Sequence, residues 1–167
     1  MIDEELARIA TLRDAGNHED AYKHAMVLVR EFPTDVRAQV VSAYACDRTD
    51  REHEAVSYYA AAYRMGIPED EQAGFLLGYG STLRNVGRTI EALDVLRKAS
   101  RLFPNDAAIV AFLAITLHSA QRNEEAMATM IRAALMAARD DGFGRYVRAL
   151  REYQEELAAS TDGAGQT

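Results

Sequence analysis

The sequence predicts an all-α protein built from helix pairs that repeat along the chain. Four alanines, Ala21, Ala55, Ala92 and Ala126, lie 34, 37 and 34 residues apart. A regular interval of this length is typical of a stack of equivalent structural units. The apolar residues between them recur every three or four positions, which is the period of an α-helix. Alanine is abundant throughout, and it has the highest helix propensity of any residue.

The third unit shows the pattern of one helix pair most clearly. Its first half has apolar and small residues at helical spacing, and Gly87 can adopt a positive φ just past the helix end. Thr89, a good N-cap, is expected to begin the second helix, which Pro104 ends. Gly80 on the first helix and Ala92 on the second are small, so they mark the place where the two helices cross closely.

This third unit resembles the tetratricopeptide repeat (TPR), a 34-residue helix–turn–helix unit. The family pattern is an aromatic residue, Leu-Gly, Tyr, then Ala, a second aromatic residue and a closing Pro. The corresponding residues here are Leu76, Tyr79-Gly80, Leu83, Ala92, Leu96 and Pro104. The resemblance implies a right-handed α–α superhelix of about four repeats, with a capping helix at its C-terminal end.

The other repeats follow the same plan in chain order. We predict four repeats, at about residues 2–35, 36–68, 73–106 and 107–139. Ala15-Gly16-Asn17 and the polar run 47–50 are the expected turns of the first two repeats. The longer interval between the second and third alanines is explained by about three extra residues in the loop 65–71, and Asn105-Asp106 is expected to cap the fourth repeat.

The C-terminal part predicts one more helix and a tail. After an expected turn at Asp140-Asp141-Gly142, apolar residues at helical spacing predict a capping helix at about 143–157. Such a helix would shield the apolar face of the last repeat from water. Residues 159–167 are small and polar, so we expect a disordered tail after a single solenoid domain at 1–158.

Composition narrows the possible partners and location. The formal net charge of −7 disfavours nucleic acid and anionic membranes as partners. The sequence has no run of 18 apolar residues and no secretory signal at its N-terminus, so a cytoplasmic protein without a membrane span is expected. The single cysteine, Cys46, excludes an internal disulfide and fits a reducing compartment.

The residues that usually perform chemistry do not form a catalytic pattern. His18-Glu19 and His53-Glu54 lack the second histidine of a zinc-protease motif, and the histidines are expected to be solvated or capping. Gly78-Tyr79-Gly80 lacks the third glycine of a dinucleotide-binding loop and no strand precedes it. Cys46 is expected to be a small buried residue. We therefore expect no enzyme activity, no cofactor and no metal site.

The resemblance places the binding surface on the first helices of the repeats, which line the concave side of such a superhelix. Tyrosine and arginine are the residue types most enriched where binding energy is concentrated. The predicted partner-binding residues are Arg13, Tyr44, Arg48, Leu77, Arg84, Ile115 and His118. For Leu77 and Ile115, packing between neighbouring repeats is an equal alternative.

Three functions remain open from the sequence. The first is an adaptor that binds a peptide or segment of a partner protein in its groove. The second is a chaperone for a type III secretion translocator, because acidic chaperones of that class are similar in length and also resemble TPR proteins. An enzyme is the third and least favoured. The Met-rich helix that contains Met127, Met130 and Met136 also allows a homodimer, unless the C-terminal helix covers it.

Overall fold

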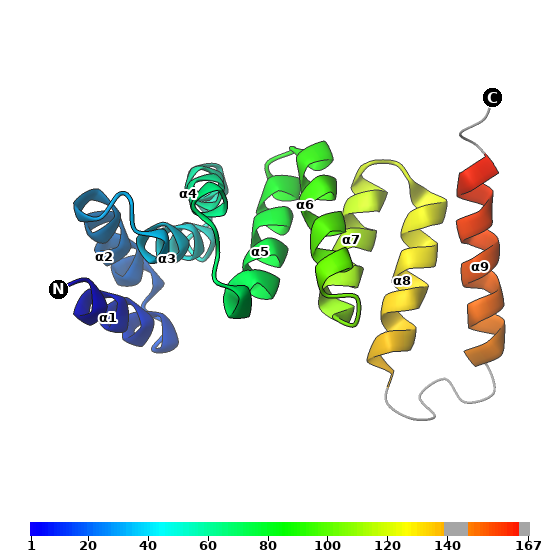
Figure 1. Ribbon diagram of the computed structural model, residues 1–167, viewed down its shortest axis with the longest axis horizontal. Helices are drawn as coiled ribbons and strands as arrows, with labels where there is room; N and C mark the ends of the chain where they lie inside the picture. Colours follow the sequence, from blue (N-terminus) through cyan, green and yellow to red (C-terminus); the bar gives the residue numbers. More distant parts are fainter. Residues whose placement is uncertain (139–146, 164–167) are drawn as a thin grey trace. The chain divides into compact units, whose positions relative to one another are not determined.

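We describe the protein from a computed structural model, in which residues 1–138 and 147–163 are described (Figure 1). These residues form nine α-helices, one short 3-10 helix and no β-strand. The prediction of an all-α protein is therefore confirmed. The chain divides into two compact units, Met1–Val86 and Gly87–Thr167, and each unit is described by itself. The single solenoid domain at 1–158 stays a prediction.

The helices follow one another in pairs. Their bounds are α1 (Ile2–Asp14), α2 (His18–Glu31), α3 (Val36–Asp47), α4 (Glu52–Met65), α5 (Gln72–Asn85), α6 (Thr89–Leu102), α7 (Ala107–Ser119), α8 (Asn123–Ala137) and α9 (Val147–Gly163). The connection from α4 to α5 is longer than those after α2 and α6, and it contains the 3-10 helix η1 (Glu69–Glu71). This is the loop in which the extra residues of the third repeat were expected.

The turn inside each helix pair has the same backbone geometry. A residue with positive φ closes each turn, and these residues are Gly16 (φ 77°), Asp50 (58°), Gly87 (81°) and Gln121 (62°). Each of them lies five residues before one of the four regularly spaced alanines, and all four alanines are buried. The interval seen in the sequence is therefore also a repeat of structure, and the expected positive φ of Gly87 is confirmed.

Two predicted helix caps have different outcomes. The carboxylate of Asp106 accepts hydrogen bonds from the backbone N–H groups of Ala108 and Ile109, at 2.9 and 3.1 Å, so this cap is confirmed. Thr89 is not an N-cap, because the helix already includes it and Arg88 occupies the N-cap position. The Arg88 side chain makes no capping hydrogen bond and instead donates to the Glu91 carboxylate. The turn after Gly87 is thus one residue shorter than expected.

The core of the first unit centres on aromatic rings from α3, α4 and α5. Tyr59 on α4 is almost completely buried, and its ring stacks on Tyr79 at 5.4 Å between centroids. It also meets Phe75 edge-on at 5.3 Å and Tyr44 at 5.9 Å. Offset and edge-on ring pairs are favourable beyond the area they bury. This cluster fixes α3, α4 and α5 against one another and so positions the residues described below.

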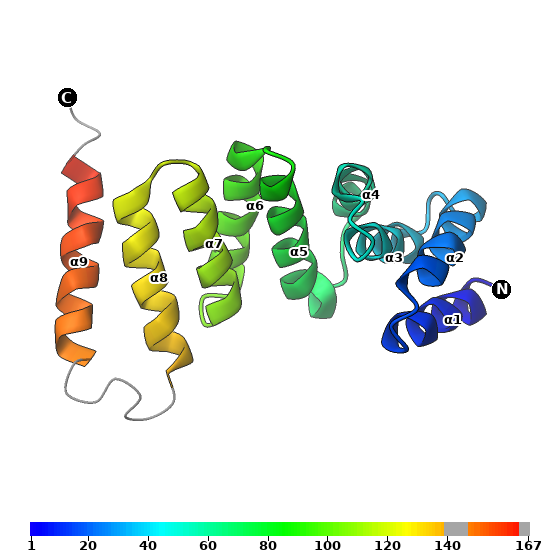
Figure 2. The ribbon, with the colours of Figure 1, turned by 180° about the vertical axis from the view of Figure 1, so that it is seen from behind.

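The second unit packs α6, α7, α8 and α9 in chain order, and Figures 1 and 2 show α7, α8 and α9 side by side. Its core contains Leu93 and Leu96 from α6 and Leu113 and Leu117 from α7, with Ala126 from α8. The small Ala126 side chain leaves room for the leucines of the neighbouring helices. The close Gly80–Ala92 crossing expected in the third repeat involves one residue from each unit and stays a prediction.

The C-terminal helix differs from its predicted bounds. α9 packs against α8 and continues to Gly163, so the prediction of a disordered tail is wrong for residues 159–163. The sequence offers no proline, and no glycine before Gly163, to stop the helix after Leu157. The expected turn at Asp140-Asp141-Gly142, the start of the capping helix at 143–146 and residues 164–167 lie outside the described residues.

Candidate partner-binding site

The first unit has a hollow between helices α1, α3, α4 and α5. Three of these, α1, α3 and α5, are the first helices of their pairs. The hollow is lined by Arg13, Tyr44, Asp47, Arg48, Tyr59, Gly74, Leu77 and Gly78. We call it the central hollow.

An apolar pocket adjoins the central hollow on the side of α1 and α2. Its lining is mostly aliphatic and consists of Leu6, Ile9, Ala10, Arg13, His18, Ala21, Val41, Tyr44, Ala45 and Arg48. Arg13, Tyr44 and Arg48 line both spaces. Together the two form a continuous surface in which two guanidinium groups and one aromatic ring stand between an apolar part and a polar part.

The structure brings four of the seven predicted binding residues together. Arg13, Tyr44, Arg48 and Leu77 all line the central hollow. Arg84 is on the same helix as Leu77, but it does not line this hollow and its guanidinium donates to the Asn85 side chain at 2.7 Å.

The other two predicted residues belong to the second unit. Ile115 and His118 are both on α7, and 37 % of the Ile115 side chain is exposed. The Nδ1 atom of His118 lies 2.8 Å from the Asn123 side-chain oxygen. A role for these two residues in binding stays a prediction.

The charged groups of the surface differ in how far they are already paired. Arg13 forms an exposed ion pair with its neighbour Asp14 at 2.9 Å. Arg48 is exposed and, within the part of the chain that the structure describes, forms no hydrogen bond or ion pair through its side chain. The Nδ1 atom of His18 is buried in the pocket without a partner among the described residues. Both Arg48 and His18 can therefore bind groups of a ligand.

Asp47 at the end of α3 supports the floor of the central hollow. Its carboxylate accepts a hydrogen bond from the Tyr59 hydroxyl at 2.6 Å and from the Thr82 hydroxyl at 2.9 Å. Burial raises the pKa of Asp47, and the two hydrogen bonds act in the opposite direction. Burial also raises the pKa of Tyr44 to about 12, helped by the charges of Glu71 and Asp47. Burial raises the pKa of the Tyr59 hydroxyl as well, so both tyrosines are neutral hydrogen-bonding groups at physiological pH.

Gly78 is a residue of the site to which the sequence analysis assigned no packing partner. A Cβ atom at this position would lie 2.6 Å from the Tyr59 hydroxyl oxygen, so only glycine fits between α5 and the Tyr59 side chain. The signal in the sequence was a glycine inside a helix, where it costs stability relative to alanine. The sequence analysis instead assigned close helix packing to Gly80, two residues further along the chain.

Cys46 lies beside this surface but is not available for chemistry. Its side chain is completely buried, which confirms the expectation of a small buried residue. Burial raises the pKa of the Cys46 thiol to about 12, so at physiological pH the reactive thiolate form is very rare.

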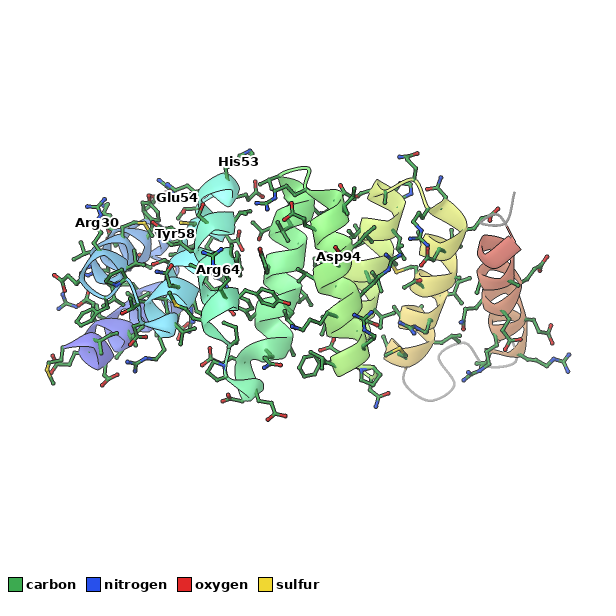
Figure 3. The ribbon with its side chains drawn as sticks, turned by 45° about the horizontal axis from the view of Figure 1, so that its top comes forward. Arg30, His53, Glu54, Tyr58, Arg64 and Asp94 are labelled. Atoms are coloured by element: carbon green, nitrogen blue, oxygen red, sulfur yellow. The ribbon has the colours of Figure 1, made fainter. Side chains whose placement is uncertain are left out.

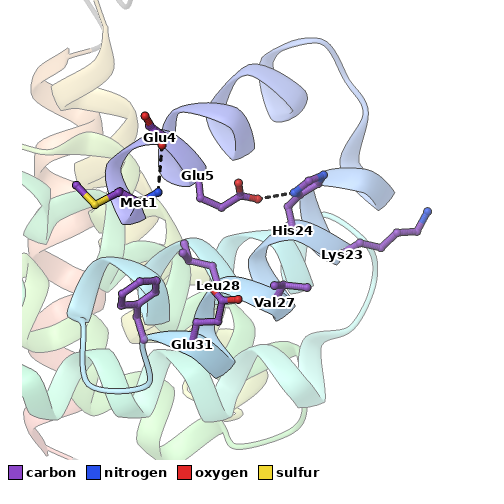
Figure 4. Close-up of a pocket in the computed structure, with 9 residues that line it drawn as sticks. Met1, Glu4, Glu5, Lys23, His24, Val27, Leu28 and Glu31 are labelled. Carbon is purple, nitrogen blue, oxygen red and sulfur yellow. Dashed lines mark hydrogen bonds and ion pairs between the residues drawn. The ribbon is translucent and has the colours of Figure 1, made fainter.

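A second hollow in the first unit lies between α1 and α2 (Figure 4). Most of its charged groups are already paired: Glu5 with His24, Glu4 with the N-terminal amino group and Lys23 with Asp20. Val27 is 52 % exposed at its rim. Because few of its polar groups are free to bind a ligand, this hollow is the weaker candidate.

A network of polar side chains connects α2 and α4, and its groups bind one another. Glu54 and Tyr58, labelled in Figure 3, are joined by a hydrogen bond of 3.4 Å, and the Tyr22 hydroxyl donates to Glu54 at 3.1 Å. The Arg51 guanidinium lies 4.2 Å above the Tyr22 ring and pairs with Glu19. These contacts bind α2 to α4, so we assign them a role in structure.

Within residues 1–138 and 147–163, no cluster of three or more histidine, cysteine, aspartate or glutamate side chains is arranged to bind a metal ion. The helices in these ranges are also too short or too polar to span a lipid bilayer.

Comparison with known proteins places the chain in a family. The family model described as "Tetratrico peptide repeat" matches residues 36–157, which is more than half of the chain. The chain belongs to the tetratricopeptide repeat family. The match covers the second to fourth repeats and part of α9. The first repeat lies outside it but has the same turn geometry, with a positive φ at Gly16 and a buried Ala21.

Among solved structures, this TPR chain is similar to YrrB, described as a TPR protein with an unusual peptide-binding site. The TM-score is 0.68 at 17 % sequence identity, and the match covers 92 % of this chain and 80 % of that one. At this identity the likeness shows the fold alone. A search among curated proteins finds no match.

Proposed function

We propose that this TPR chain is a protein-interaction module that binds an extended segment of a partner protein in the central hollow and the adjoining apolar pocket. The TPR family generally consists of non-catalytic interaction scaffolds, which supports this class of function. The observation that carries the proposal is the shared lining of the two spaces by Arg13, Tyr44 and Arg48, because it gives one ligand both an apolar and a polar contact.

The chemistry of the lining indicates what the partner segment contributes. The apolar pocket, with Ile9 and Ala21 at its base, accommodates an aliphatic side chain. The guanidinium of Arg48 offers hydrogen-bond donors to carboxylate or backbone carbonyl oxygens of the segment. Tyr44 lies between these contacts and supplies a large, rigid side chain, which is typical of the residues that dominate binding energy.

The experiment is a pull-down from the source organism with wild type and matched variants, followed by affinity measurement with the captured partner. The test variant combines Arg48→Gln with Leu77→Gln. The control is Arg64→Gln, which neutralises an exposed arginine on α4 (Figure 3). We expect the test variant to weaken binding by about tenfold or more and the control to bind like wild type. Equal binding by all three proteins would rule out the central hollow.

The nature of the captured partner addresses the second function predicted from the sequence. A membrane-active client of a secretion system would favour the translocator chaperone, and a soluble protein would favour a general adaptor. The chaperone role, the cytoplasmic location and the homodimer stay predictions.

A further inference from the structure

The second unit has a hollow of its own that is rich in arginine. It lies between α6 and α8, with α9 along one side, and four arginines line it: Arg97, Arg101, Arg122 and Arg132. Glu125 is the only carboxylate among the described residues that line it. The chain as a whole has a net charge of −7, so this excess of positive charge is a local feature of the hollow. We call this space the arginine hollow.

Part of this positive charge is neutralised within the hollow. The Glu125 carboxylate pairs with Arg122 at 2.5 Å and with Arg97 at 3.5 Å. These pairs connect α6 to the start of α8. The Glu125 carboxylate thus forms ion pairs with two guanidinium groups, so the charges of Arg97 and Arg122 are partly compensated.

Among the residues that the structure describes, no carboxylate pairs with the remaining two arginines. Arg132 donates to the Ser100 hydroxyl at 3.2 Å, which is a neutral acceptor. Arg101 is exposed and forms no side-chain hydrogen bond or ion pair with any residue that the structure describes. Ser100, which contacts Arg132, lies next to Arg101 on α6. The uncompensated charge is therefore concentrated at one end of the hollow.

We propose that this end of the arginine hollow binds the phosphoryl group of a phosphorylated serine or threonine on a partner protein. A phosphate monoester carries a charge that approaches −2 at physiological pH, and two guanidinium groups balance it. A single carboxylate would leave one of them uncompensated. The planar guanidinium also matches phosphate oxygens with two parallel hydrogen bonds. The hydroxyls of Ser100 and Thr129 and the amide of Gln154, which line the same hollow, add neutral hydrogen-bonding groups.

The arginine hollow shares no lining residue with the central hollow. Binding of a phosphoryl group here would therefore be a second interaction, in addition to peptide binding in the central hollow. The arginines come from α6, from α8 and from Arg122 just before α8, which are the second helices of their pairs. The central hollow uses mainly first helices. A partner bound at the arginine hollow would be recognised by its phosphorylation state.

The probe for the test is a labelled pentapeptide with one phosphoserine between glycines, whose binding is followed by fluorescence anisotropy at about 0.1 M salt. The comparison peptides carry serine or glutamate at the same place. We expect the phosphoserine peptide to bind at least about tenfold more tightly than either one, because hydrogen bonds to charged groups are strong and the glutamate has half the charge.

Matched variants locate the binding. Arg101→Gln with Arg132→Gln should lower the affinity for the phosphoserine peptide by about tenfold or more. Arg30→Gln with Arg64→Gln changes the net charge equally, at exposed positions of the first unit, and should leave the affinity unchanged. Thermal unfolding of both double variants checks that they fold.

Four outcomes would overturn the proposal. These are no detectable binding of the phosphoserine peptide at millimolar protein, equal binding of the glutamate peptide, equal losses in the two double variants, and displacement by inorganic phosphate as effective as by the unlabelled peptide. The last would assign the site to free phosphate. Arg48→Gln should not change the binding, which keeps this test independent of the central hollow.

Discussion

Gly74 and Gly78 on α5 differ in the space that surrounds them. Gly74 is helical with open space around it, whereas Gly78 directly faces the hydroxyl of Tyr59. Tyr59 cannot easily move away, because its ring is buried and its hydroxyl is held by Asp47. The same residue type thus has no packing role at one position and is required at another, one turn further along the helix.

The corresponding alanine substitutions should have effects of opposite sign. Gly74→Ala should raise the free energy of unfolding by roughly 0.5–1 kcal/mol, because alanine favours the helix. Gly78→Ala should lower it by about 1–3 kcal/mol, because the new methyl group forces Tyr59 from its position. Urea unfolding of both variants measures the difference. If both variants were stabilised, the close approach of Tyr59 to α5 would be wrong.

The burial of Cys46 makes its reactivity a measure of unfolding. With a thiol pKa of about 12, the thiolate fraction at pH 8 is on the order of 10⁻⁴, compared with roughly a quarter for an ordinary cysteine. We expect native protein to react with a thiol reagent at least about a hundredfold more slowly than protein in denaturant. Similar rates in both conditions would contradict complete burial.

At the scale of elements, Asp47 joins three helices. It ends α3 and accepts hydrogen bonds from Tyr59 on α4 and from Thr82 on α5. Thr82 also has the carbonyl oxygen of Gly78 as an acceptor at 2.9 Å, whereas Tyr59 depends on Asp47. The loss of this carboxylate would therefore leave the buried Tyr59 hydroxyl without its hydrogen-bond acceptor.

This dependence can be measured with a double-mutant cycle. Asp47→Ala should lower the free energy of unfolding by about 1–3 kcal/mol, because the buried Tyr59 hydroxyl then has no acceptor for its hydrogen bond. Adding Tyr59→Phe should recover part of that loss, since it removes the unpaired group. Urea unfolding of the two single variants and the double variant gives the coupling. Additive effects would show that the hydrogen bond contributes little.

The raised pKa of Asp47, caused chiefly by burial, also predicts a pH dependence. A carboxyl group with a raised pKa in the folded state favours folding most when it is protonated. Its contribution is complete below the ordinary value of about 3.9 and is lost as the pH rises through the raised value. Compared with Asp47→Asn, wild type should gain stability as the pH falls from 7 toward 4. A constant difference between the two unfolding curves would contradict this.

At the scale of the whole molecule, net charge governs how the chain behaves in solution. The sequence pI is about 5.1, so the protein carries almost no net charge near pH 5 and self-association is then least opposed. We expect a solubility minimum close to this pH. Replacing the exposed Glu69 and Asp70 by lysine should move the minimum to higher pH, as turbidity against pH would show. A minimum that does not move would indicate association through apolar contacts.

The exposed methionines of α8 could form such apolar contacts in the predicted homodimer. Met127 is 55 % and Met130 is 37 % exposed on α8, although α9 packs on the same helix. Sedimentation at high micromolar concentration decides whether a second copy covers them. A purely monomeric protein would end that prediction.

The sequence alone was sufficient for the helix pairs, because alanines such as Ala21 and Ala92 and turn glycines such as Gly16 and Gly87 act through local geometry. Helical periodicity and positive φ are properties of neighbouring residues. The same local information was insufficient at Thr89 and at the end of α9, where the start or stop of a helix depends on one or two residues.

Tertiary structure alone decided which side chains meet. Arg13 and Leu77 are 64 residues apart in the sequence, yet they line one hollow. Tyr59 reaches Asp47 only because Gly78 leaves room for it. The arginine hollow was not visible in the sequence, where its four arginines are spread over three dozen positions. The repeat pattern depends on contacts close in the chain, whereas both candidate sites depend on the packing of distant helices, which spacing alone does not specify.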